Sequence, residues 1–280
     1  MPSGRYSNSP MPRSSAHANG HVRLVASDLD GTLLRSDDSV SERTLAALAR
    51  TIEAGIRFVL VSARSPGWLA PEAARLGLDG IGICCNGAVV YEYEESRVLI
   101  HRPLEPETAR EIVFGLRRVA PGVAFGCERP SGFLAETAYR PLFRPPDSIP
   151  RADARSILSE PVTKLVLQHP ELSQADLHAL ASDLAGERAE TCYSGAGLVE
   201  VAAPGVTKGA ALADLCAELE IDRSKVIAFG DMLNDVSMLA WAGRGIAVAN
   251  AHDEVLAVAD EVTASNDEDG VALVLERLRS

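Results

Sequence analysis

Residues 24–32 read Leu-Val-Ala-Ser-Asp-Leu-Asp-Gly-Thr, an apolar run that gives way to two aspartates, a glycine and a threonine. The run predicts a short buried strand with the polar residues at its carboxyl end. The same pattern recurs twice downstream. Residues 57–61 are followed by Ser62-Ala63-Arg64, and residues 80–85 are followed by Asn86-Gly87. Each run therefore predicts a strand that delivers polar side chains at the same end.

Amphipathic helices are expected between these strands. Ser41 is a good N-cap for a helix that ends at Ala54, and the spacing predicts that Leu45, Leu48 and Ile52 share its buried face. Another helix is expected between the second and third strands. Alternating strands and helices are typical of a parallel α/β sheet, whose strand ends form one edge where ligands bind. We therefore expect the polar residues that follow the strands to lie close together.

The middle of the chain has a different, α+β texture, and its strands are expected to be antiparallel. The expected strands span 89–93, 98–100, 164–168 and 198–201, and the expected helices span 105–119 and 174–184. The α/β pattern resumes after residue 203, and a strand at 226–229 runs into Gly-Asp-Met-Leu-Asn-Asp at 230–235. We therefore predict a disordered tail at residues 1–20, a Rossmann-like three-layer core at 21–87 and 204–280, and an inserted α+β cap at 88–203.

The composition excludes several classes of protein. The chain has 280 residues, of which 39 are acidic and 27 basic, so its formal net charge is -12. It lacks the basic surface expected for binding nucleic acid or an anionic membrane. No apolar run reaches the roughly 18 residues of a membrane span. Five cysteines without metal-binding spacing favour a reducing compartment, so we expect a cytoplasmic protein.

The expected strand ends combine four carboxylates with a lysine and a hydroxyl. These residues are Asp28, Asp30, Asp231, Asp235, Lys208 and Ser62. Carboxylates that converge at a sheet edge repel one another unless a cation neutralises them, and hard oxygen ligands favour Mg²⁺. The lysine and the hydroxyl are suited to hold a phosphoryl group, to which Gly31 and Thr32 would offer backbone N–H groups. The sequence therefore predicts a magnesium-dependent phosphoryl-transfer site.

Four short motifs carry a family resemblance. DLDGTLL at 28–34, VSAR at 61–64, Lys208 in GVTKG and GDMLND at 230–235 resemble, in this order, the motifs of the haloacid dehalogenase-like phosphohydrolases. The inserted segment is similar to the cap of their Cof-type subfamily. One motif departs from the family pattern, because Ala63 stands where glycine is usual. The neighbouring Ser62 keeps the hydroxyl that would contact phosphate.

The resemblance implies a role for each residue of the site. Asp28 would be the nucleophile that forms an aspartyl-phosphate, and Asp30 would be the general acid and base. Ser62 and Lys208 would hold the phosphoryl oxygens. The implied Mg²⁺ ligands are Asp28, the backbone carbonyl of Asp30 and Asp231, with Asp235 acting through water or by orienting Lys208. The implied substrate contacts are Asn86, Gly31, Thr32 and Asn234.

The predicted function is that of a Mg²⁺-dependent phosphatase acting on small phosphomonoesters, such as a sugar phosphate or a phosphorylated cofactor. Its expected partner is this small-molecule phosphate ester, and neither nucleic acid nor a membrane is expected to bind. We expect a monomer or a homodimer. Two alternatives stay open, a phosphomutase on the same scaffold and a non-catalytic phospho-receiver or regulator.

Further residues are interpreted by their chemistry. The candidates for substrate specificity in the cap are Glu128, Arg129, Arg140, Arg144 and Tyr193. Arg64 is interpreted as a structural ion-pair partner, and Asn86 as either a turn former or a substrate contact. Trp68 and Trp241 lie on apolar helix faces, which predicts that both belong to the core.

Overall fold

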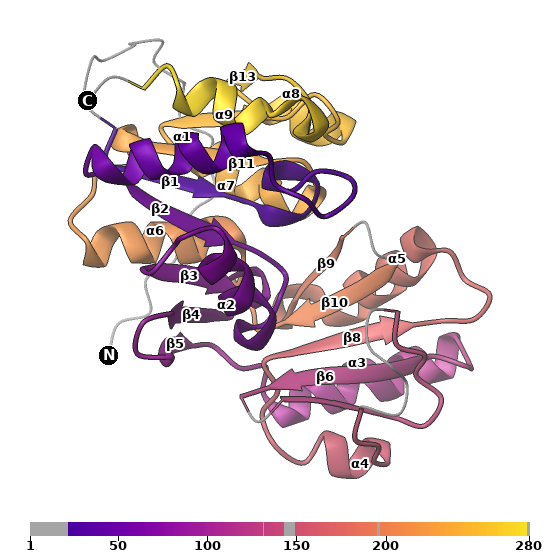
Figure 1. Cartoon of the computed structure of the whole chain (residues 1–280). Helices are drawn as coiled ribbons and strands as arrows, with labels where there is room; N and C mark the ends of the chain where they lie inside the picture. The colour runs from indigo at the N-terminus through magenta and orange to yellow at the C-terminus, as the bar shows by residue number, and fades with distance from the viewer. Residues whose placement is uncertain (1–21, 131, 143–148, 195–196, 279–280) are drawn as a thin grey trace.

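The computed structural model describes residues 22–130, 132–142, 149–194 and 197–278. The predicted tail at residues 1–20 and the cap candidate Arg144 lie outside the described residues. The described chain folds around two separate sheets, the smaller of which lies below the larger in Figure 1. No described helix combines the length and the apolarity needed to cross a membrane.

The larger sheet has eight strands in the order β13-β12-β11-β1-β2-β3-β4-β5. They are β1 (Leu24–Ser27), β2 (Arg57–Val61), β3 (Ile81–Cys84), β4 (Val89–Glu92), β5 (Arg97–His101), β11 (Val226–Gly230), β12 (Arg244–Ala247) and β13 (Glu261–Val262). From β13 to β3 the pairing is parallel, as the sequence predicts. β1 is buried on both faces, because Leu24 and Ala26 pack on one side and Val25 on the other.

Helices cover both faces of the larger sheet. One layer contains α1 (Glu42–Glu53), α2 (Pro66–Arg75) and α9 (Gly270–Leu275), and the other contains α6 (Lys208–Glu218), α7 (Val236–Trp241) and α8 (Asp253–Val258). Strands with apolar side chains on both faces require such a three-layer arrangement, because each row of side chains has to be covered. The predicted α/β class and Rossmann-like three-layer architecture are confirmed.

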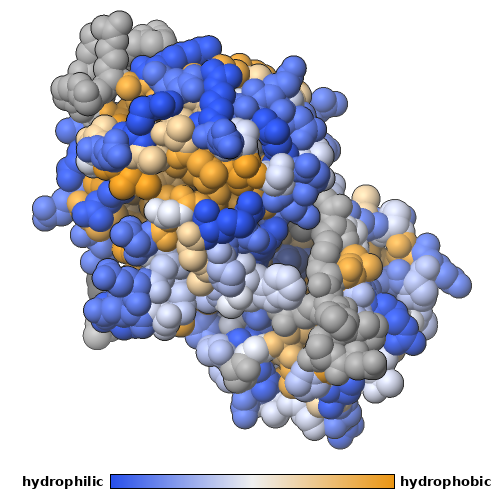
Figure 2. Space-filling view, viewed as in Figure 1, coloured by the Kyte–Doolittle hydropathy of each residue, from blue (hydrophilic) through white to orange (hydrophobic). Residues whose placement is uncertain are grey.

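Helix α1 presents a different face to the core from the predicted one. Leu48 is buried as expected, but Leu45 and Ile52 are each 37% exposed. The helix packs instead through the smaller Ala47 and Thr51, which are buried. Ala47 and Leu48 belong to the same buried cluster as residues of α9, whereas Leu45 and Ile52 do not. Figure 2 shows apolar residues at the surface over this part of the molecule.

The smaller sheet has five antiparallel strands in the order β7-β6-β8-β10-β9. They are β6 (Ala124–Arg129), β7 (Gly132–Ala135), β8 (Lys164–Gln168), β9 (Glu190–Ser194) and β10 (Leu198–Ala202). Helices α3 (Pro106–Val119), α4 (Ala154–Ile157) and α5 (Gln174–Ala185) pack on one of its faces. The sequence did not predict β6, β7 or β9. For β6 and β7 the reason is that residues 125–149 show no clear hydrophobic period.

The hairpin β4–β5 corrects the predicted domain boundary. The sequence assigns both strands to the inserted cap, whereas they extend the larger sheet antiparallel to β3. Val90 pairs with Ile83 and is buried in a cluster of the larger sheet. The turn at Asn86-Gly87 folds the chain back along β3, so an antiparallel texture alone does not mark the start of the cap.

Candidate active site

The strand register brings the polar strand ends together. Ser27, the last residue of β1, pairs with residues near the ends of β2 and β11. The next residue, Asp28, donates its backbone N–H to the carbonyl of Phe229 over 3.0 Å. Asp28, Ser62 and Asp231 therefore lie at one edge of the sheet, and all three line the same cavity.

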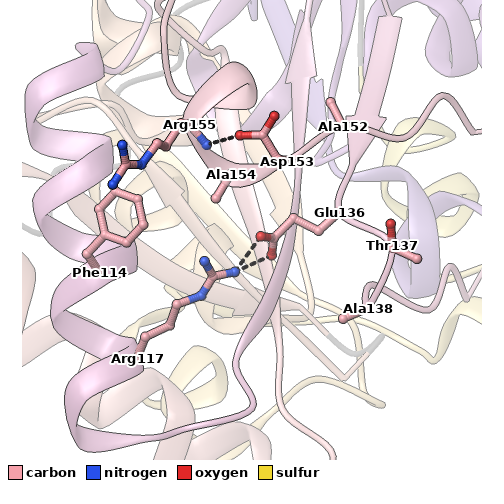
Figure 3. Close-up of a pocket in the computed structure, with 9 residues that line it drawn as sticks. All are labelled: Phe114, Arg117, Glu136, Thr137, Ala138, Ala152, Asp153, Ala154 and Arg155. Carbon is pink, nitrogen blue, oxygen red and sulfur yellow. Dashed lines mark hydrogen bonds and ion pairs between the residues drawn. The ribbon is translucent and has the colours of Figure 1, made fainter.

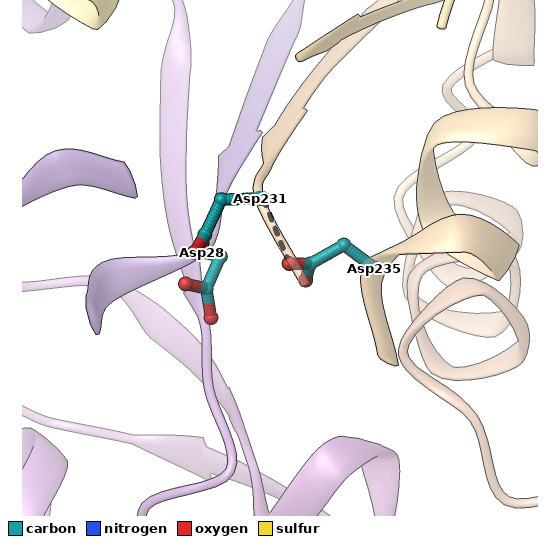
Figure 4. A group of neighbouring side chains, drawn as sticks. All are labelled: Asp28, Asp231 and Asp235. Atoms are coloured by element: carbon teal, nitrogen blue, oxygen red, sulfur yellow. Dashed lines mark hydrogen bonds between the residues drawn. The ribbon is translucent and has the colours of Figure 1, made fainter. Parts of the chain in front are cut away.

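Three aspartates and one lysine form the centre of this edge. Carboxylate oxygens of Asp28, Asp231 and Asp235 lie within 4.8 Å of one another, and all three residues are buried (Figure 4). The Nζ of Lys208 donates hydrogen bonds to Oδ1 of Asp28 and to Oδ1 of Asp235, each over 2.6 Å. The hydroxyl of Thr32 donates to Oδ1 of Asp231 over 2.6 Å. One buried cation therefore faces three carboxylates.

Burial and surplus negative charge raise the pKa of two of these carboxyls. Burial raises the pKa of Asp28 well above its ordinary value, Lys208 offsets part of the rise, and Asp235 and Asp231 add to it. Burial and repulsion from Asp235 raise the pKa of Asp231 to about 6. Burial alone would lower the pKa of Lys208, but Asp235 and Asp28 outweigh it and raise this pKa. The lysine therefore stays charged at neutral pH.

The carboxylates of Asp28, Asp231 and Asp235, called the acid group from here on, fit a hard divalent cation. Their donors are oxygens, which Mg²⁺ prefers, and a cation would relieve the repulsion between the carboxylates. Gly31 makes room beside Asp231: a Cβ at Gly31 would lie 2.6 Å from Oδ2 of Asp231, and its φ is +81°. Asp235 is less available to coordinate a cation, because it accepts hydrogen bonds from Lys208 and from the N–H groups of Asp231 and Met232. Asp28 and Asp231 are the carboxylates best placed for this role.

Without metal, the protein is expected to lose stability as the pH rises from about 4 to 6. The pKa of Asp231 is about 6 in the fold against an ordinary 3.8. In this window the folded protein binds a proton that the unfolded chain has released, so the free energy of unfolding falls as the pH rises.

Asp231→Asn removes this charge and should stabilise the metal-free protein at pH 7 by on the order of 2–3 kcal/mol. Urea unfolding in EDTA measures the difference, and the free energies of unfolding of the two proteins should become equal near pH 4. Equal stability of parent and variant at pH 7 would contradict the prediction.

Asp30 lies apart from the acid group. Its side chain is 49% exposed, and Nη2 and Nε of Arg64 donate hydrogen bonds to Oδ1 and Oδ2 over 2.5 and 3.0 Å. The interpretation of Arg64 as an ion-pair partner is confirmed. Only Asp28, Asp231 and Asp235 group as potential metal ligands among the described residues. The carboxylate of Asp30 therefore lies outside this group, and the metal contact through its backbone carbonyl stays a prediction.

Ser62 and Asn86 follow the next two strands. Ser62 is buried, and its Oγ accepts the N–H of Arg64 over 3.1 Å. Asn86 has a left-handed φ of +56°, and its Oδ1 accepts a hydrogen bond from Nδ2 of Asn234 over 3.0 Å. Asn86 therefore forms the turn and also belongs to the polar network of the site. Oδ1 of Asn234 is buried with no hydrogen-bond partner among the described residues, so an acceptor remains available beside the cavity.

A buried ion pair from the smaller sheet reaches these loops. Nζ of Lys164 in β8 lies 2.6 Å from Oε1 of Glu200 in β10, and both side chains are buried. Nζ of Lys164 also donates to the carbonyl of Ala63 over 2.8 Å, and Oε2 of Glu200 accepts from Nδ2 of Asn86 over 2.6 Å. Burial alone would lower the pKa of Lys164, but Glu200 raises it. The pair therefore ties the smaller sheet to two loops of the larger one.

Sequence reasoning missed this pair. Lys164 opens a strand that continues Leu-Val-Leu, and Glu200 lies inside Leu-Val-Glu-Val-Ala. A charged residue within an apolar strand is buried only when it is paired, and this rule could have identified both residues.

Of the five cap residues proposed for specificity, Glu128 lines the cavity. Arg129 donates instead to the carbonyl of Ile157, and Arg140 to that of Thr137. Tyr193 packs edge-on against His178, with ring centroids 5.0 Å apart.

The cavity has a volume of about 760 Å³ and is lined by residues of both sheets and their loops. Trp68, which the sequence places in the core, is 43% exposed and lines this cavity. It lies in the first turn of α2, where the helix leaves the strand edge, so its ring faces the space between the two sheets. Trp241 is partly buried against the core, as predicted.

A second hollow, of about 500 Å³, lies in the smaller part of the molecule (Figure 3). Two of its charged side chains, Arg117 and Glu136, form an ion pair. Nη2 of Arg117 donates to both carboxylate oxygens of Glu136 over 2.5 Å, and Asp153 accepts the N–H of Arg155 over 2.9 Å. None of the predicted catalytic residues lines this hollow. The candidate active site is therefore the larger cavity.

Lys164→Met is expected to destabilise the fold by about 3–5 kcal/mol, because it leaves Glu200 buried without its cation. Urea unfolding measures this loss. Arg118→Met, on the exposed side of α3, is the control and should change stability by less than about 0.5 kcal/mol. Adding Glu200→Met to Lys164→Met should recover part of the loss. A loss below about 1 kcal/mol in the single variant would argue against a buried pair.

Fold and site together define a hydrolase of phosphoric monoesters, built on a Rossmann-like sheet with an acid group at its carboxyl edge. The chain belongs to the haloacid dehalogenase-like hydrolase family, whose family model matches residues 25–275. The predicted family and enzyme class are thereby confirmed.

The chain is similar to named phosphatases along most of its length. It is 32% identical to the pyridoxal phosphate phosphatase YbhA of Escherichia coli (strain K12), over 90% of this chain and 96% of that protein. It is 28% identical to the HMP-PP phosphatase of Cronobacter sakazakii, over 84% of this chain and 87% of that protein. The solved structure of SMU.1108c from Streptococcus mutans UA159 matches with a TM-score of 0.80 at 27% identity, covering 91% of this chain and 98% of that one.

Proposed function

We propose that the protein is a Mg²⁺-dependent phosphatase that hydrolyses small phosphomonoesters through an aspartyl-phosphate on Asp28. One observation carries this proposal. The buried carboxylate of Asp28 lies against Lys208 inside the acid group, and it lines the cavity between the two sheets. A carboxylate beside a positioned ammonium group is suited to attack phosphorus, because the cation stabilises the charge on the transferring group.

The reaction has two displacements. A carboxylate oxygen of Asp28 attacks phosphorus, the P–O bond to the substrate's alcohol breaks, and Asp30 gives its proton to the departing alkoxide. Asp30 then takes a proton from a water molecule, whose oxygen attacks phosphorus and releases inorganic phosphate and Asp28. The carboxylate of Asp30 is paired with Arg64, and both residues line the cavity.

The remaining residues hold charge and position. Lys208 and Ser62 hold the phosphoryl oxygens, and Asp235 positions Lys208. Asn86, Asn234 and the backbone at Gly31 and Thr32 contact the bound substrate. The residues that would hold Mg²⁺ are Asp28, Asp231 and the carbonyl of Asp30. When bound, the ion supplies positive charge beside the incoming phosphate.

Two observations support the proposed substrate class: the smaller sheet lies over the cavity, and similar proteins are named for small organic phosphates. The smaller sheet and its loops cover the cavity, which favours a small substrate over a phosphoprotein or a nucleic acid. Two relatives are named for pyridoxal phosphate and for HMP-PP, both small organic phosphates. We therefore propose a sugar phosphate or a phosphorylated cofactor as the substrate of this chain.

The test is phosphate release from a broad panel of phosphometabolites with Mg²⁺, ranked by kcat/KM. Small phosphoesters should turn over repeatedly, and a higher rate on phosphopeptides would contradict the proposal. Repeated turnover also excludes a phospho-receiver. In ¹⁸O-labelled water, released phosphate should carry one label, whereas transfer to a second sugar hydroxyl would indicate a phosphomutase.

A further inference from the structure

The face of the smaller sheet that lines the cavity has two zones. Directly opposed residues on neighbouring strands share a face, and residues two apart along a strand return to it. The register pairs Glu128 with Lys164 and with Phe133, and it pairs Val166 with Glu200. All five residues therefore lie on one face, opposite the side that packs under α3 and α5. The polar zone contains Glu128, Lys164 and Glu200, and the apolar zone contains Phe133, Val166 and Leu198.

The apolar zone is built around an aromatic ring. Phe133 leans across Gly126, since a Cβ at that glycine would lie 2.3 Å from Cζ of Phe133. Tyr139 packs against the same ring, with centroids 5.6 Å apart. Val166 and Leu198 belong to the same buried cluster. This part of the cavity is therefore a preformed apolar surface next to the phosphate site.

The described lining of the cavity offers little positive charge for a second anionic group. Its only basic side chains are those of Arg64 and Lys164. Arg64 is paired with Asp30, Lys164 is paired with Glu200, and Glu128 adds negative charge near Lys164. A carboxylate or second phosphate on the substrate would therefore be repelled by the acidic part of the wall.

We propose that the substrate is the phosphomonoester of an uncharged aromatic alcohol. The aromatic ring of this substrate packs against Phe133 and Val166 of the smaller sheet and against Trp68 of helix α2. This inference rests on the proposed function and selects an aromatic alcohol over a sugar. An aromatic ring gains contact area and ring–ring packing on this wall. A sugar would bring hydroxyls against apolar side chains, and each unpaired hydroxyl lowers affinity by about tenfold.

The first test uses the parent protein and three substrates with Mg²⁺. Benzyl phosphate and ribose 5-phosphate are both esters of primary alcohols, so their leaving groups are similar, and acetyl phosphate is a small reference. Benzyl phosphate should exceed ribose 5-phosphate in kcat/KM by about tenfold or more. A para-carboxylate on the benzyl ring should lower kcat/KM by about tenfold.

The second test uses substitutions in the apolar zone of the cavity. Phe133→Ala should lower the ratio of kcat/KM for benzyl phosphate to that for acetyl phosphate by about tenfold, mainly through KM, and Phe133→Leu by less. Binding of benzylphosphonate, measured by calorimetry, should weaken in the same order. Phe114→Ala is the matched control, because Phe114 lies on α3 and lines the second hollow. It should leave the ratio and the binding unchanged.

The outcomes separate the two proposals. A protein that hydrolyses acetyl phosphate but prefers ribose 5-phosphate to benzyl phosphate overturns this inference and leaves the proposed function intact. The same holds if Phe133→Ala and Phe114→Ala give equal ratios. A protein that hydrolyses none of the three substrates overturns the proposed function, and this inference with it.

Discussion

Asp28→Asn is expected to lower phosphate release by at least about 10⁴-fold, because the amide does not attack phosphorus. The fold should persist. Asparagine has the shape of aspartate, and its Oδ1 can still accept the hydrogen bond that Lys208 donates over 2.6 Å in the parent. Burial raises the pKa of Asp28, so the substitution also removes an unfavourable buried charge. Steady-state phosphate release and circular dichroism measure the two effects.

The matched control for this variant is Asp37→Asn. Asp37 is exposed and accepts the N–H of Ser39 over 3.0 Å, outside the cavity. Its substitution should leave kcat/KM within about twofold of the parent. Acid quenching with ³²P-labelled substrate should trap label on the parent but not on Asp28→Asn. Parental turnover in a folded Asp28→Asn protein would remove Asp28 as the nucleophile.

Exhaustive chelation is expected to lower phosphate release by at least about 10²-fold, and added Mg²⁺ should restore it. Without a divalent cation, Lys208 alone balances three buried carboxylates, and the surplus negative charge repels the phosphate group. The test is an assay in EDTA, with metal content verified, followed by Mg²⁺ titration. Activity that survives complete chelation would contradict the proposed chemistry.

Metal binding has a second readout that does not depend on activity. Mg²⁺ at 100 times its Kd should raise the free energy of unfolding by about 2.7 kcal/mol, because it binds the folded state only. Asp231→Asn should reduce this gain strongly, since it removes a proposed ligand. If Mg²⁺ raised the free energy of unfolding equally in the parent and in Asp231→Asn, the ion would bind elsewhere. Asp37→Asn again serves as the control.

Most of the larger sheet was predictable from local pattern. The apolar runs at β1, β2 and β11 have the length of buried strands, and each ends in polar residues. Ser41 caps α1 as predicted. These features depend on residues only a few positions apart in the chain, so they can be predicted from the sequence alone. The grouping of Asp28 with Asp231 followed from one further rule, that parallel strands end at a common edge.

The smaller part was harder to predict. Its strand β6 reads Ala-Phe-Gly-Cys-Glu-Arg, in which Gly126 interrupts the apolar pattern in order to seat the ring of Phe133. The predicted buried face of α1 was also wrong for Leu45 and Ile52, because the helix packs in the cluster that it shares with α9 through Ala47 and Leu48. In both cases a neighbour distant in sequence decides which residue fits. Hydrophobic period alone does not contain that information.

The order of elements and the family follow from short motifs, and the acid group follows from two of these motifs together with the common edge of parallel strands. The wall of the cavity does not follow from any motif. Glu200 meets Lys164 across 36 positions of chain and Asn86 across 114. Such contacts form only after the strands of the smaller sheet have paired in one register and packed over the larger sheet. Burial then makes each charge depend on its partner, which is why the folded chain, and not any local stretch of it, sets what the cavity can bind.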